Sequence, residues 1–69
     1  MAETEIIFSV QESPEGGYEA RALGHSIFTQ ADTWEELRSN VREAVEAFYF
    51  DRPAPTRLRL HLVRDEVLG

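Results

Sequence analysis

The chain has 69 residues, of which seven are basic and thirteen acidic, for a formal net charge of -6. This length allows a single domain over residues 1–69, and the absence of cysteine excludes disulfides as support for its small core. The acidic balance disfavours binding of DNA and RNA, because their affinity for proteins comes from neutralised phosphates; it fits solubility alone or a basic protein partner.

So short a domain buries only about 60% of the surface that its unfolded chain exposes. Association is the remaining common support, so we expect a homo-oligomer, either a dimer or a tetramer. No apolar run reaches the length of a signal peptide or membrane span, and residues 1–5 lack a basic start. We therefore expect a cytoplasmic protein without a membrane partner, and we find no metal or cofactor motif.

The first predicted element is a strand over residues 5–11. Ile6, Phe8 and Val10 share one face of this strand, and Ile7 and Ser9 lie on the other. This alternation predicts a strand with at least one buried face.

A second strand is predicted over residues 18–23, where the alternation resumes. Between the two strands, a proline followed by Gly16 and Gly17 indicates a hairpin turn that needs positive φ. A break at residues 24–26 precedes a short third strand over residues 27–30.

The clearest element is the helix that begins after Thr33. Thr33 and Glu36 fit a capping box, in which Thr33 is the N-cap and Glu36 reaches back to its amide. Asp32 adds negative charge at the positive end of the helix dipole. The aromatic run over residues 48–50 closes the helix, because the prolines beyond it cannot continue it. The apolar stripe has helical spacing and consists of Trp34, Leu37, Val41, Ala44, Val45 and Phe48.

The last predicted strand covers residues 57–63, with leucines on one face and a largely basic opposite face. A helix between two strands favours a right-handed crossover, which makes the last strand parallel to the third. The predicted fold is therefore α+β in the order β-β-β-α-β, a four-stranded mixed sheet with one helix packed on one face.

Three motifs occur in a fixed order: a glycine–aromatic hairpin at residues 15–20, a helix start at residues 29–33, and a helix rich in Glu, Ala and Asn over residues 35–45. In this order they resemble the HicB-type antitoxin domain, and the resemblance covers roughly residues 5 to 65. It implies a partial ribonuclease-H-like fold with the sheet order 3-2-1-4. Its structural motif residues here are Gly16, Gly17, Tyr18, Asp32, Thr33 and Glu36.

The resemblance also implies a function, which is to block a small basic RNA-cleaving toxin by steric occlusion. Family antitoxins often carry a further DNA-binding segment, whereas this chain ends at Gly69, so we expect no DNA binding and no repressor role. The family's proline-containing stretch is replaced here by residues 23–26. The alternative is a stand-alone homo-oligomeric domain that binds a small ligand between its subunits.

Catalytic interpretations find little support in the residues. A ribonuclease-H nuclease needs metal-binding carboxylates on its central strands, and the interior of the first predicted strand contains none. His25, Ser26 and Asp32 are residue types of a hydrolase triad, but adjacent residues on a strand point apart. His25 and His61 lack the spacing of metal ligands. We expect no enzyme activity and no catalytic residues.

Two groups of residues are candidates for interface contacts. Tyr49 and Phe50 exceed what one helix face can bury, and aromatic residues are enriched at interfaces. The second group is the only basic cluster, which consists of Arg57, Arg59, His61 and Arg64. We interpret it as an edge-protecting face or as a contact with acidic residues of a neighbouring subunit, in preference to an RNA site.

A further candidate partner surface is acidic and lies near the predicted hairpin. It consists of Glu12, Glu15 and Glu19, whose charge would attract a basic protein.

Overall fold

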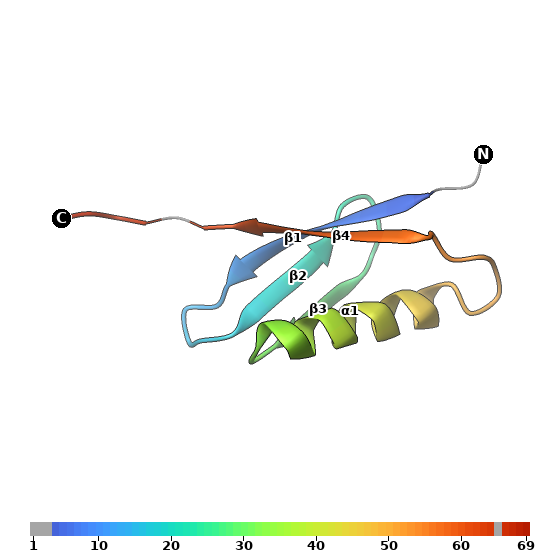
Figure 1. Cartoon of the computed structure of the whole chain (residues 1–69), viewed down its shortest axis with the longest axis horizontal. Coiled ribbons are helices and arrows are strands. Elements are labelled where there is room, and N and C mark those ends of the chain that lie inside the picture. The colour runs from blue at the N-terminus through green and yellow to red at the C-terminus, as the bar shows by residue number, and fades with distance from the viewer. Residues whose placement is uncertain (1–3, 65) are drawn as a thin grey trace.

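The computed structural model describes residues 4–64 and 66–69. The strands form one sheet in the order β3-β2-β1-β4, and one helix lies on one of its faces (Figure 1). This confirms the predicted α+β fold and sheet order. In chain order the elements are β1 (Glu5–Glu12), β2 (Tyr18–Ala22), β3 (Phe28–Ala31), α1 (Trp34–Phe48) and β4 (Arg57–Val63).

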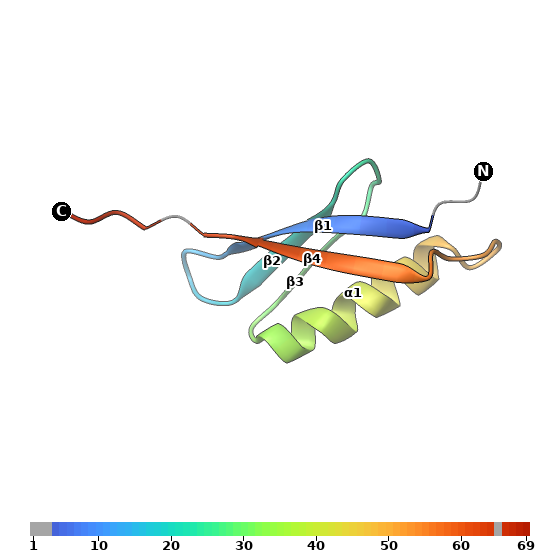
Figure 2. The same cartoon turned by 45° about the horizontal axis from the view of Figure 1, so that its top comes forward.

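The pairing of the strands follows from how they are connected. Short turns join β1 to β2 and β2 to β3, and both pairs are antiparallel. The helix connects β3 to β4, so β4 runs parallel to β3 and pairs in parallel with β1 (Figure 2). In this register Phe8 faces Ala22 on one side and Leu60 on the other.

The core lies between the sheet and α1. On β1 the predicted alternation is confirmed, because Ile6, Phe8 and Val10 are all buried. The middle of the predicted helix stripe is buried as well, whereas its remaining members pack at the rim of the core. Burial of each large aliphatic side chain contributes about 1.5–3 kcal/mol. The other buried residues are Ala20, Ala22, Ile27, Leu37, Val41 and Val45.

The turn between β1 and β2 has the predicted positive φ angles, 99° at Gly16 and 85° at Gly17. The amide of Ser13 donates to the carbonyl of Gly17 at 2.9 Å and closes the turn. A Cβ atom on Gly17 would lie 2.5 Å from the carbonyl oxygen of Ala31. Only glycine therefore lets the turn pack against the end of β3.

Thr33 is the N-cap of α1, as predicted, and its hydroxyl accepts a hydrogen bond from the Glu36 amide at 3.1 Å. The second half of the predicted capping box is wrong. The Glu36 carboxylate accepts from the Thr33 hydroxyl at 3.3 Å, because that hydroxyl can donate while it accepts from the amide.

The helix ends one turn after Val45. Its last residue is Phe48, and Tyr49 is the C-cap, whose amide donates to the Val45 carbonyl at 2.9 Å. The predicted aromatic run therefore straddles the helix end, with Phe50 beyond it.

Within the part of the chain that the structure describes, no helix has the length and apolar character needed to cross a membrane.

Candidate functional site

A polar hollow of about 430 Å³ lies between the turn before β2, the end of β3 and the first turns of α1. We call it the acidic groove, because the ionisable side chains in its lining include the carboxylates of Glu15, Asp32 and Glu36 and no Lys or Arg. All three residues are exposed to solvent. The rest of the lining comes from Ser13, Gly16, Tyr18, Gln30, Ala31 and Asn40.

Contacts between the elements hold the walls of the acidic groove in place. The ring of Tyr18 meets the ring of Trp34 edge to face, with 5.3 Å between their centroids and 80° between their planes. The side-chain amide of Asn40 donates to the carbonyl of Gln30 at 3.0 Å and ties α1 to β3. The groove is thus shaped by the packing of three elements rather than by one loop.

This arrangement suits a cation. Carboxylates accept charge-assisted hydrogen bonds from ammonium and guanidinium groups, and three carboxylate residues line one concave surface here. Asp32 and Glu36 also stabilise the helix, since they place negative charge at the positive end of its dipole. A bound cation would therefore meet carboxylates that the fold already holds at the start of α1.

The structure brings the predicted motif residues together around this groove. Gly16, Tyr18, Asp32 and Glu36 line it, and Gly17 and Thr33 are their direct neighbours in the chain. Sequence reasoning missed the roles of Gln30 and Asn40 in the lining. One signal for the lining was available in the sequence. Asn40 is a polar residue directly before Val41, and Val41 belongs to the apolar stripe of the helix.

The three acidic residues predicted as a partner surface are not brought together. Only Glu15 lines the acidic groove. Glu12 pairs with Arg64. Glu19 lies in a separate hollow of about 270 Å³ on the face of the sheet away from α1, beside Arg21.

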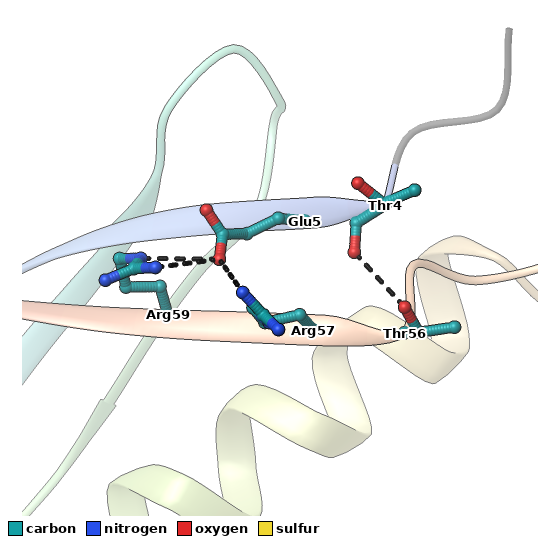
Figure 3. A network of polar contacts seen from close by, with 5 residues as sticks. All are labelled: Thr4, Glu5, Thr56, Arg57 and Arg59. Carbon is teal, nitrogen blue, oxygen red and sulfur yellow. Dashed lines mark hydrogen bonds and ion pairs between the residues drawn. The ribbon is translucent and has the colours of Figure 1, made fainter.

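The basic face of β4 is paired with acidic residues of its own chain. The Glu5 carboxylate on β1 accepts from the Nε and Nη2 atoms of Arg59 at 3.3 and 3.2 Å (Figure 3). Arg57 lies 3.9 Å from the same carboxylate oxygen. Acidic partners of these arginines are thus on the adjacent strand of the same chain, because the parallel pairing of β1 with β4 puts Glu5 beside Arg57.

Arg64 extends this pairing beyond the end of β4. Its guanidinium donates to the Glu12 carboxylate from two nitrogens, and this contact raises the pKa of Arg64 above its ordinary value. Among the arginines of the basic cluster, the side chains of Arg57, Arg59 and Arg64 are all engaged within the chain.

Two curated proteins resemble the chain along most of its length. A UPF0150 protein of Thermotoga maritima is 43% identical over 65 residues, which cover 94% of this chain and 91% of that protein. The chain belongs to the UPF0150 family. A UPF0150 protein of Archaeoglobus fulgidus is 52% identical over 50 residues, which cover 72% of this chain and 74% of that protein. The family name states no activity, substrate or partner.

Two further comparisons found nothing. No family model matches this UPF0150 chain, and no solved structure matches it. The HicB-type relationship therefore stays a resemblance carried by the motifs themselves.

The two aromatic candidates for interface contacts differ in their surroundings. Tyr49 is half-buried and meets the rings of His25 and Phe48 at centroid distances of 6.4 and 5.1 Å. The guanidinium of Arg52 covers the Tyr49 ring at 4.9 Å. Phe50 is 84% exposed. Of these two aromatic side chains, Phe50 is the more exposed and therefore the one with apolar surface that a partner could cover.

His25 and Asp32, two residue types of a hydrolase triad, lie at opposite ends of α1. His25 packs against Phe48 in the last turn, with 5.8 Å between the ring centroids, whereas Asp32 precedes the first turn. The helix between these two places has 15 residues and is about 22 Å long. His61 lies on the exposed face of β4, and residues 4–64 and 66–69 hold no group of three potential metal-ligating side chains.

Proposed function

We propose that this UPF0150 protein is an antitoxin-like binding module that neutralises a small basic RNA-cleaving protein in the cytoplasm by steric occlusion. The observation that supports this proposal is the acidic groove, which Glu15, Asp32 and Glu36 line without a Lys or Arg among the lining residues. A lysine or arginine side chain of the partner would enter the groove, and the partner's active surface would be covered by the domain.

The distribution of charge supports a basic partner. Arg57 and Arg59 pair with Glu5, and Arg64 pairs with Glu12, so these positive charges are partly offset within the chain. The net charge of -6 would also steer a cationic protein toward the domain and increase the rate of encounter.

The rigidity of the groove supports the same function. Its walls are tied together by the Tyr18–Trp34 ring contact and by the hydrogen bond from Asn40 to Gln30. Binding then needs little further ordering of the domain, and preorganisation of this kind lowers the entropic cost of association.

The second candidate is the stand-alone homo-oligomeric domain, which binds a small ligand between its subunits. The observation that favours self-association is the uncovered β4 edge, which is considered below.

A tagged pull-down from the native host, followed by mass spectrometry, tests the proposal first. We expect a stoichiometric small basic protein whose RNA cleavage stops when the purified domain is added. Recovery of only the tagged chain and its copies, or a partner that cleaves RNA equally well in the complex, would contradict the antitoxin-like function.

A charge-neutral substitution then tests the groove itself. The double change Glu15→Gln and Asp32→Asn removes two lining carboxylates with little change in shape, and we expect binding of the basic partner to weaken about tenfold or more. The matched control is Glu43→Gln with Glu46→Gln, which removes the same charge from exposed helix positions outside the lining. Equal weakening by both pairs would mean that only net charge matters.

A further inference from the structure

The outer edge of β4 presents a regular row of backbone hydrogen-bonding groups. The amide of Arg57 donates to the carbonyl of Thr4, which shows that this residue points toward β1. Successive residues of a strand direct their backbone groups to opposite edges. The amides and carbonyls of Leu58, Leu60 and Leu62 therefore point outward, where no strand of the described chain lies.

The side chains of the same three leucines form an apolar row on the face of the sheet that carries α1. Leu58 and Leu60 are only half-buried, and Leu62 is 40% exposed. Between this row and α1 lies a hollow of about 230 Å³, lined by Trp34, Val41 and the first two leucines together with Arg38 and Arg42. The row is thus only partly covered by its own helix.

We propose that two copies of this chain associate through their β4 strands, which pair antiparallel about a twofold axis at Leu60. Leu60 then faces its counterpart, and Leu58 faces Leu62 of the second copy. All three are outward-pointing residues, so each exchanges backbone hydrogen bonds with its opposite number. The sheet continues from one copy into the next, and the two leucine rows become one apolar surface.

The charges of β4 agree with this register. Antiparallel pairing about Leu60 places Arg57 opposite Val63 and Arg59 opposite His61, so no arginine faces an arginine. A shift of the axis to Arg59 would place that residue opposite its own counterpart, which is destabilising. Arg57 and Arg59 are also drawn toward Glu5 on the other side of the strand, so they do not shield the edge (Figure 3).

The same twofold axis brings together exposed residues from opposite ends of β4. Val67 and Leu68 are 91% and 86% exposed and lie on the segment that continues the line of β4 away from the domain (Figure 1). Antiparallel pairing directs this segment past the start of β4 in the second copy, beside the loop that carries Phe50 and Arg52. In the register about Leu60, residues 66–69 of one copy would lie level with residues 51–54 of the other.

The inference is independent of the proposed function, because the acidic groove and the outer edge of β4 share no residue. A dimer would keep both grooves accessible, one in each copy.

Light scattering of the purified full chain after size-exclusion chromatography gives the first test. We expect a mass of twice the 7.9 kDa of the chain, and a shift toward the monomer on dilution. A monomer at high micromolar concentration, or an oligomer that survives loss of the β4 contacts, would overturn the proposal.

Leu62→Lys is the variant that targets the edge, since it places a lysine in the apolar row at a position already 40% exposed. We expect the dimer to weaken about tenfold or more. The control is Phe28→Lys, the same kind of change at a 51% exposed residue of β3, and it should leave the mass unchanged. Circular dichroism of both variants separates loss of pairing from loss of folding.

Amide hydrogen exchange measured by NMR tests the backbone pairing without any substitution. In the dimer, the amides of Leu58, Leu60 and Leu62 should be protected as well as those of Arg59 and His61. Fast exchange at the three leucines beside slow exchange at their neighbours, in a sample with the dimer mass, would show that the copies meet elsewhere.

A single introduced cysteine tests the register, because the natural chain has none. Leu60→Cys lies on the twofold axis, where opposite Cα atoms about 5.5 Å apart suit a disulfide, so oxidation should link the two copies. Leu62→Cys faces Leu58 and should link poorly. The reverse result would overturn the axis at Leu60.

Discussion

The two edge strands of the sheet, β3 and β4, differ in the hydrogen bonding of their outward backbone groups. β3 has only four residues, and the carbonyl of Gln30 accepts a hydrogen bond from Asn40 on α1. The amide of Ala22 donates to the carbonyl of Ile27, so by alternation Gln30 points outward, and Asn40 therefore bonds to an outward carbonyl of this edge. β4 has seven residues, and its outward backbone groups meet no element of the described chain.

The difference follows from the connection that leads to each strand. α1 begins at Trp34, directly after β3 ends at Ala31, so the helix packs beside that strand and beside β2. β4 enters on the far side of β1, after the loop that follows α1. In this fold α1 thus bonds to the outer edge of the strand that it follows, whereas the outer edge of the strand that it precedes stays open in the described chain. Edge strands of that kind are sites for pairing with another chain.

The largest expected effect comes from the turn that supports the protected edge. Gly17→Ala should lower the free energy of unfolding by about 2–4 kcal/mol, because the residue has φ of 85° and its Cβ would meet the Ala31 carbonyl at 2.5 Å. Urea unfolding followed by circular dichroism measures it. Gly16→Ala is the control, with no atom within 4 Å of the added Cβ and an expected cost of about 1 kcal/mol. Equal costs would show that the contact with β3 has no effect.

The second-largest loss of stability is expected at Thr33, the N-cap of the helix that packs beside β3. Thr33→Ala should cost about 1 kcal/mol, because the Glu36 amide loses its acceptor. Thermal unfolding would detect this loss. Thr56→Ala is the matched control at the start of β4, where the hydroxyl makes a longer contact of 3.4 Å with the Thr4 carbonyl. A larger effect at Thr56 would reverse the comparison between the two edges.

A smaller effect is expected when the side chain that closes the β3 edge is removed. Asn40→Ala takes away the donor to the Gln30 carbonyl and should cost about 0.5 kcal/mol, because the bond is exposed to solvent. Ser39→Ala, at the adjacent exposed position, should be within about 0.5 kcal/mol of the wild type. If the two variants unfold at the same urea concentration, Asn40 does not stabilise this edge.

The smallest effect concerns the ion pairs beside the open edge. Glu5→Gln should change the free energy of unfolding by about 0.2–1 kcal/mol, since the side chains of Arg57 and Arg59 are 71% and 56% exposed and solvent screens the interaction. The effect should shrink in high salt, which urea titrations at two salt concentrations would measure. A salt-independent loss would mean that Glu5 acts through packing.

Features of the fold that depend on neighbouring residues could be predicted from the sequence. The alternation of Ile6, Phe8 and Val10, the N-cap at Thr33 and the positive φ of Gly16 and Gly17 all arise from local backbone geometry, and the structure confirms each of them. The strand order came from the resemblance, because alternation places a side chain on a face but does not select its neighbouring strand.

The candidate site was predictable only in part. Its motif residues were known in advance as structural ones, yet the acidic groove forms only because the turn, β3 and α1 meet at one corner. The predicted trio of Glu12, Glu15 and Glu19 is divided among three surroundings, since strand alternation sends Glu19 to the face away from the helix.

The sequence by itself determined the elements, their buried faces and the residues that begin and end the helix, because these follow from interactions a few residues apart. Only the tertiary structure decided that Glu5 pairs with Arg57 and Arg59, more than fifty positions away, and that Asn40 bonds to one edge strand while the outer edge of the other stays open. Such contacts depend on which strands are neighbours, and that choice is made by the packing of the whole chain.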